Sequence, residues 1–116
     1  MPDIYDQHAK AFARVEAHVI LKDGERVATI AFKFPADGAG RLWAYVHWIG
    51  LEMVRGYASG YGYDKRTAAC SSVAYKVLEA PNFIESAAFW HALAKDGGNT
   101  WDRQLREAGF TVLQAV

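Results

Sequence analysis

Cysteine is nearly absent from this chain, since Cys70 is the single one among 116 residues and has no internal partner for a disulfide. One thiol is typical of a protein in a reducing compartment, so we expect a cytoplasmic location. No apolar run approaches the length of a membrane span, and the first residues lack the basic and apolar segments of a signal peptide. We therefore expect neither a disulfide-stabilised secreted scaffold nor membrane association.

Net charge is also absent, because thirteen basic and thirteen acidic side chains cancel and no basic stripe stands out. Proteins that bind nucleic acids usually carry a basic excess, since contacts to phosphates supply much of their affinity. The sequence therefore argues against a nucleic-acid partner. Apolar residues make up 52% of the chain, which is enough to build a core without metals or disulfides.

Catalytic and metal-binding motifs are missing as well. The histidines lie far apart, at His8, His18, His47 and His91, and none has the spacing of paired metal ligands. There is no Gly-x-Ser-x-Gly segment, and no two carboxylates have an arrangement that indicates acid–base catalysis. Cys70 lies beside an apolar helical stripe and is interpreted as a core residue. We expect no catalytic residues, no metal and no cofactor. A small hydrolase or transferase that uses His47 or Asp64 is the enzymatic alternative.

Alternating apolar residues predict strands over the first half of the chain, at about 12–21, 26–34, 41–49 and 52–59. The Asp-Gly pair at 23–24 predicts a tight hairpin between the first two. In the first strand, one face carries Val15, Ala17, Val19 and Leu21. The other face carries Arg14, Glu16 and His18, and we expect this polar face to point away from the helices, together with Thr29 and Lys33.

Helical periodicity predicts three helices in the second half, from Asp64 to about 80, from about 82 to 95, and from about 100 to 108. A capping box at Asn82–Glu85 and Gly109 at the C′ position support these limits. Residues 110–116 predict a final strand. The chain is thus predicted to be a single α+β domain over 1–116. We expect a mainly antiparallel sheet of four to five strands, helices packed on one face, and residues 1–10 as an N-terminal arm.

The most informative motif is the glycine- and tyrosine-rich segment 56–66. It lacks the spacing of a Walker A loop or a dinucleotide fingerprint. Its glycines nevertheless permit close approach of the backbone to a ligand, and the following helix start favours an anion. The predicted site for a nucleotide or another anion consists of Tyr57, Gly60, Tyr61, Gly62, Tyr63, Lys65 and Arg66. The alternative is a bulged strand end and a capped helix without a ligand.

The strand at 41–49 is apolar on both faces. Leu42, Ala44, Val46 and Trp48 alternate with Trp43, Tyr45 and His47. Either both faces are buried, as in a central strand, or one face is an interface. The helices supply apolar surface for one face of the sheet. We therefore predict a twofold homodimer with Trp43, Tyr45 and His47 at or near its interface.

The run Gly60-Tyr61-Gly62-Tyr63-Asp64-Lys65, followed by Thr67-Ala68-Ala69, resembles a segment of small, largely uncharacterised proteins of bacterial prophages and other mobile elements. The segment 108–112 adds a weaker similarity. The resemblance transfers no functional residues, but it implies a setting in which small proteins bind a host complex, such as a CRISPR effector, or sequester a signalling nucleotide. We therefore expect a non-enzymatic inhibitor that binds a host protein complex in counter-defence. Nucleotide sequestration is the alternative.

Overall fold

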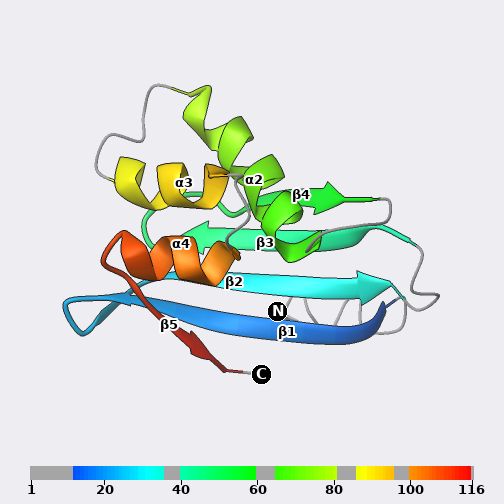
Figure 1. Cartoon of the computed structure of the whole chain (residues 1–116), viewed down its shortest axis with the longest axis horizontal. Helices are drawn as coiled ribbons and strands as arrows, with labels where there is room; N and C mark the ends of the chain where they lie inside the picture. Colours follow the sequence, from blue (N-terminus) through cyan, green and yellow to red (C-terminus); the bar gives the residue numbers. More distant parts are fainter. Residues whose placement is uncertain (1–11, 36–39, 60–64, 81–85, 96–99, 116) are drawn as a thin grey trace.

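The computed structural model describes residues 12–35, 40–59, 65–80, 86–95 and 100–115 (Figure 1). These ranges form strands β1 (Phe12–Lys22), β2 (Glu25–Pro35), β3 (Leu42–Trp48) and β4 (Val54–Ala58), helices α2 (Lys65–Leu78), α3 (Ala87–Ala94) and α4 (Trp101–Glu107), and strand β5 (Thr111–Gln114). The predicted α+β class and its element order are confirmed. The predicted N-terminal arm lies outside the described residues.

One sheet holds all the described strands, in the order β4-β3-β2-β1-β5, and each neighbouring pair is antiparallel. Helices α2, α3 and α4 lie on the same side of this sheet, as predicted (Figure 1). They lead the chain from the edge strand β4 to the opposite edge, where β5 pairs with β1. No helix within the described ranges is long and apolar enough to cross a membrane.

A two-residue turn joins β1 to β2, as the Asp-Gly pair predicts. Asp23 and Gly24 both have positive φ, at 52° and 81°. Positive φ at both central residues is the geometry of a type I′ turn, whose twist matches that of the flanking strands. The register shifts beside this turn, because Ile20 pairs with Ala28 whereas Leu21 pairs with Arg26, which leaves Val27 of β2 as an extra residue.

The core lies between the helices and one face of the sheet, which we call the inner face. Its sheet residues are Ile20, Ala28, Ile30, Phe32, Leu42, Ala44 and Val46, and its largest helix residues are Phe89, Trp90, Leu93, Trp101 and Leu105. Cys70 is buried in this core, as the sequence predicts. The opposite side of the sheet, away from the helices, is the outer face.

The predicted orientation of β1 is wrong. Glu16, His18 and Ile20 pair with Phe32, Ile30 and Ala28, which are core residues of β2, so this polar set belongs to the inner face. His18 is 8% exposed and Ile20 is fully buried. The apolar set at positions 15, 17, 19 and 21 therefore lies on the outer face, where all four residues are half-buried.

This reversal has a physical reason in the pairing of the hairpin. A shift of the pairing register by one residue moves every side chain of the strand to the other face of the sheet. The inner face of β2 is set by Ile30 and Phe32, so the partners of these residues must share it. The polar residues are accommodated because Arg66 pairs with Glu16 and the ring of Trp101 packs against His18.

Gly56 in β4 has a packing role, and the bulge that is the alternative interpretation of this segment does not occur between Val54 and Ala58. Pairing between β3 and β4 is regular from Val46↔Val54 to Leu42↔Ala58. A Cβ atom at Gly56 would lie 2.9 Å from the backbone nitrogen of Val73 in α2. Glycine therefore allows α2 to approach the edge strand closely.

Gly109 ends α4 as predicted, with φ of 97°. The amide of Phe110 donates to the carbonyl of Leu105, and the amide of Gly109 donates to that of Arg106. These two bonds form a Schellman motif, in which the left-handed residue is usually glycine. The predicted capping box at Asn82–Glu85 lies outside the described residues.

Candidate functional site

An exposed cluster of aromatic and arginine side chains lies on the outer face where β3 and β4 pair. Trp43 is directly opposite Tyr57, and their ring centroids are 5.1 Å apart. Tyr57 is 39% exposed, although most aromatic residues whose burial the structure describes are buried or half-buried. We call Arg41, Trp43, Arg55 and Tyr57 the aromatic–arginine patch.

Two guanidinium groups extend the aromatic pair. The Cζ atom of Arg41 lies 4.5 Å from the ring centroid of Tyr57, and that of Arg55 lies 5.8 Å from the centroid of Trp43. Both arginines are exposed, and within the described residues neither has a carboxylate at ion-pair distance. The patch is therefore positively charged and carries flat apolar surface, a combination that attracts acidic groups and stacks on planar ones.

The patch borders an edge of the sheet, because β4 is the last strand on that side. Edge strands present unpaired backbone groups, which proteins often shield with charged side chains. Here the ammonium group of Lys76, in α2, donates a hydrogen bond of 2.9 Å to the carbonyl oxygen of Arg55. This contact shields part of the edge, so binding at the patch would rest on side chains more than on strand addition.

The centre of the outer face is buried, in contrast to the patch. Ala31 and Lys33 are fully buried and Tyr45 is 3% exposed. The ammonium group of Lys33 lies 4.6 Å from the ring centroid of Tyr45. Burial raises the pKa of the Tyr45 hydroxyl above its usual value, while the charge and hydrogen bond of Arg55 oppose that rise.

The three residues predicted at a dimer interface share the outer face but differ in exposure. Trp43 and His47 are half-buried, whereas Tyr45 is buried within the single chain. A second copy approaching this face would therefore meet Trp43 and Tyr57 before Tyr45. The dimer itself stays a prediction, as do the contacts of its interface.

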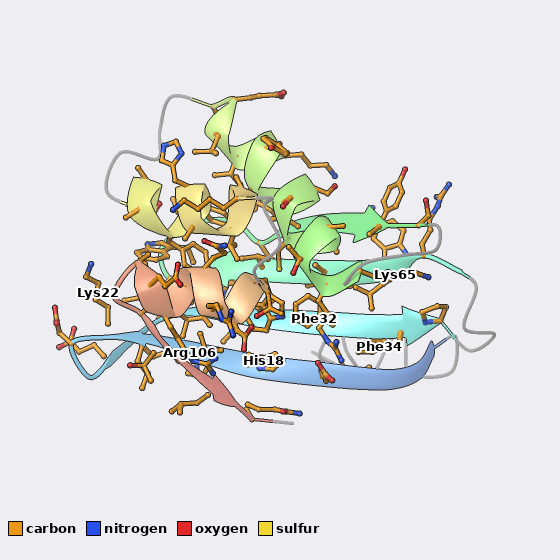
Figure 2. The ribbon with its side chains drawn as sticks, in the orientation of Figure 1. His18, Lys22, Phe32, Phe34, Lys65 and Arg106 are labelled. Atoms are coloured by element: carbon orange, nitrogen blue, oxygen red, sulfur yellow. The ribbon has the colours of Figure 1, made fainter. Side chains whose placement is uncertain are left out.

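The predicted anion site at the glycine-tyrosine segment is described only in part. Gly60, Tyr61, Gly62 and Tyr63 lie outside the described residues, as does Asp64. Lys65 is the first residue of α2 and is half-buried, at the end of the molecule opposite Lys22 (Figure 2). Tyr57 belongs to the aromatic–arginine patch, so the structure brings one member of the predicted site into a different cluster.

Arg66, another residue of that predicted site, is half-buried and engaged in an ion pair. Its Nε and Nη2 atoms each donate a hydrogen bond of 3.0 Å to the carboxylate of Glu16. Its guanidinium also lies 4.9 Å from the ring centroid of Phe34. A fork-like arginine–carboxylate pair of this kind is a strong anchor. Arg66 therefore joins the start of α2 to β1, and an anion would have to compete with Glu16 for it.

His18 completes a polar cluster with Glu16 and Arg66 on the inner face. Its Nε2 atom lies 3.4 Å from a carboxylate oxygen of Glu16. Its ring packs edge-on against Trp101 at 4.8 Å and against Phe32 at 5.8 Å. The aromatic walls and the contact with Glu16 hold this histidine in the core, so the cluster is interpreted as a structural device.

The described residues contain no group of three or more histidine, cysteine, aspartate or glutamate side chains that would hold a metal ion. His47, one residue of the enzymatic alternative, lies on the outer face opposite Thr29. The other residue, Asp64, lies outside the described ranges. The enzymatic alternative therefore remains a prediction without a described catalytic arrangement.

Sequence reasoning missed Arg41 and Arg55. The available signal was the alternation in β4, which places Arg55 and Tyr57 on one face. Pairing of β4 with β3 then brings this face beside Trp43. That pairing requires the register across the 49–53 connection, which the local pattern leaves open.

Comparisons with protein-family models, with curated proteins and with solved structures found no match for this chain.

Proposed function

We propose that this chain is a non-enzymatic binding protein that attaches to a partner protein through the aromatic–arginine patch. The observation that carries the proposal is a contact between half-buried Trp43 and exposed Tyr57, flanked by Arg41 and Arg55. Tryptophan, tyrosine and arginine are the residue types that most often dominate the binding energy of protein interfaces. Their rings here already contact each other at an interplanar angle of 52°, so little side-chain freedom is lost when a partner covers them.

The chemistry of the patch favours an acidic partner surface. Arg41 and Arg55 supply two positive charges in a chain whose formal net charge is zero. A carboxylate group facing either guanidinium would form a charge-assisted hydrogen bond, and an apolar side chain between them would cover the rings. The expected partner therefore presents acidic residues around an apolar centre.

The setting we propose is counter-defence by a mobile genetic element, in which the partner is a host protein complex such as a CRISPR effector. This part of the proposal is supported by the resemblance of residues 60–69 to proteins of prophages and related elements. Expression of the chain in cells with an active defence system tests it. Relief of interference by the wild-type chain, lost in a patch variant, is the expected result.

Affinity capture with matched variants tests the binding function. The wild-type chain is compared with the double charge reversal Arg41→Glu/Arg55→Glu and with Tyr75→Ala. Tyr75 is a control because it is 57% exposed on α2, away from the sheet. A protein retained by wild type and by Tyr75→Ala, with a Kd at least about tenfold weaker for the double variant, supports the proposal. Equal retention by all three proteins, or no retention at micromolar concentration, contradicts it.

A second copy of the chain is the other occupant that we propose for this face. A twofold dimer would place each aromatic–arginine patch against an identical surface, so like charges would approach one another unless acidic residues intervene. Sedimentation at several concentrations separates the two occupants. A single species near the monomer mass of 12.9 kDa throughout assigns the patch to a different partner.

Nucleotide or anion binding near residues 57–66 is the second candidate function. Lys65 at the start of α2 favours it, because the first turn of this 14-residue helix contains no acidic residue. Thermal unfolding with a panel of nucleotides tests it. A ligand at a hundred times its Kd stabilises the fold by about 2.7 kcal/mol, and Lys65→Ala is expected to reduce that effect. The absence of any shift leaves the segment with a structural role.

A further inference from the structure

A cleft of about 290 Å³ lies at the end of the molecule where β1 turns into β2. Its lining comes from the turn, the end of β3, the start of α3 and the residue before β5: Lys22, Asp23, Glu25, Val27, Trp48, Ser86, Ala88, Phe89 and Phe110. Trp48 and Trp43 are five residues apart on β3, or roughly 16 Å along a strand. Their side chains also lie on opposite faces, so the cleft is separate from the aromatic–arginine patch.

Three aromatic rings that contact one another form the apolar part of the cleft. The ring centroid of Phe89 lies 5.1 Å from Trp48 and 5.7 Å from Phe110. Trp48 and Phe110 meet edge to face at 6.3 Å. Phe89 and Phe110 are buried and serve as the floor, whereas Trp48 is half-buried and provides a wall. Aromatic faces of this kind attract cations through their negative π surface.

An ammonium group already occupies one of these faces. The Nζ atom of Lys22 lies 5.0 Å from the ring centroid of Phe110. Lys22 shares the rim of the cleft with the carboxylates of Asp23 and Glu25, and all three residues are exposed. One ammonium against two carboxylates leaves the rim with a formal charge of minus one, which favours a cationic ligand.

We propose that this cleft binds a small organic cation with a methylated ammonium head, and that the Lys22 ammonium is an internal competitor which the ligand displaces. A quaternary ammonium group suits the site because it is apolar on its surface and still positively charged. An anion would be repelled by Asp23 and Glu25. A neutral apolar molecule would use the rings but gain nothing from the rim.

Binding of choline, compared with its uncharged isostere 3,3-dimethyl-1-butanol, tests this proposal. The two molecules have nearly the same shape, so the difference between them reports the charge. Titration followed by the indole N–H resonance of Trp48, assigned with a Trp48→Phe variant, gives the two affinities. Choline is expected to bind about three- to tenfold more tightly than the isostere, the range of a cation–π contact.

Variants of the rim sharpen the test. Lys22→Met removes the competing cation and keeps the side-chain length, so choline affinity is expected to rise by about three- to tenfold. Lys95→Met, at the other end of α3, is the matched control for a change in overall charge. Glu25→Gln is expected to weaken choline binding, with Glu79→Gln at the end of α2 as its control. Thermal unfolding of each variant verifies that the fold is retained.

Three results would overturn the proposal. The first is equal affinity for choline and the isostere, which would make the cleft an apolar site without charge selectivity. The second is no binding of choline by either wild type or Lys22→Met at tens of millimolar. The third is an equal gain for Lys22→Met and Lys95→Met. A short peptide with trimethyllysine presents the same head on a tether, and its affinity relative to choline separates a free solute from a modified side chain as the source.

Discussion

The two faces of the sheet use the same residue types in opposite ways. On the inner face, Phe32 and Trp101 are buried and surround a histidine. On the outer face, Trp43 is half-buried and Tyr57 is exposed, and arginines lie over their rings. The inner aromatic residues therefore stabilise the fold, whereas the outer pair is the one for which we propose contact with a partner.

Burial, rather than chemical type, decides what each side chain does in this sheet. An arginine–carboxylate pair on the inner face, Arg66 with Glu16, joins two elements that are 50 positions apart. The outer arginines lie over rings and keep their guanidinium groups exposed. This comparison makes separate predictions for stability and for binding.

The largest expected effect comes from truncating an inner aromatic residue. Phe32→Ala removes a fully buried ring that contacts His18 and Trp101, and it should lower the free energy of unfolding by about 3–5 kcal/mol. Trp43→Ala, on the outer face, should lower it by about 1 kcal/mol or less, since its ring is half-buried. Urea denaturation measures both values. Equal losses would mean that the patch is part of the core.

The next effect concerns the inner ion pair. Glu16→Ala leaves the guanidinium of Arg66 without its fork-like partner and should lower the free energy of unfolding by about 1–3 kcal/mol. The side chain of Arg66 is 32% exposed, so water relieves part of the loss. A double-mutant cycle with Arg66→Ala isolates the pairwise coupling.

The exposed pair between Asp102 and Arg106 in α4 is the natural control for that cycle. The Nη1 atom of Arg106 lies 2.8 Å from the Oδ2 atom of Asp102, and the two residues have i,i+4 spacing. Exposed helical pairs of this kind contribute about 0.3–0.5 kcal/mol. A coupling for Glu16 and Arg66 that is no larger than this control would show that the inner pair is as weak as a surface one.

Packing of α2 onto the sheet edge should show a smaller but specific effect. Gly56→Ala forces a Cβ atom against the backbone nitrogen of Val73, 2.9 Å away, and should destabilise the fold by about 1–2 kcal/mol. Val73→Ala in the same chain should not restore stability, because the backbone nitrogen remains. Restoration would assign the clash to the Val73 side chain instead.

The sequence predicts most of the fold because its signals are local. The Asp-Gly turn, the alternation of β2 and β3, the helical stripe of α2 and the glycine after α4 each act within a few residues. The orientation of β1 was predicted wrongly because Val15 and Val19 make the stronger local pattern. Pairing with β2 and the ion pair with the distant Arg66 instead decide which face of β1 points toward the helices.

The candidate site was predictable only in part, for the same reason. Trp43 and Tyr57 stood out by type, but the patch forms because the register places them opposite one another. The cleft assembles Lys22, Trp48 and Phe110 from three distant segments. The alternation in β4 indicates only that Arg55 and Tyr57 share a face, and the cleft has no short-range sequence signal.

The smallest expected effect is a pH dependence of the outer face. Burial raises the pKa of Tyr45 above its ordinary value of 10.0, although Arg55 opposes the rise. The neutral phenol is thus favoured in the folded state. The contribution of the neutral Tyr45 phenol to the free energy of unfolding is complete below pH 10. It is lost as the pH rises through the folded pKa, because the phenol ionises first in the unfolded chain.

Tyr45→Phe removes this titration and the hydrogen bond with Arg55, so it should lower stability by about 0.5–1.5 kcal/mol at neutral pH. The difference in unfolding free energy between wild type and the variant should shrink between pH 10 and the folded pKa. Wild type loses stability there as Tyr45 ionises, whereas the variant has no phenol to titrate. Chemical denaturation across this range measures the difference, with Tyr75→Phe as an exposed control. A difference that grows with pH would reverse the sign of the argument, because the folded state would then favour the ionised phenol beside Lys33 and Arg55.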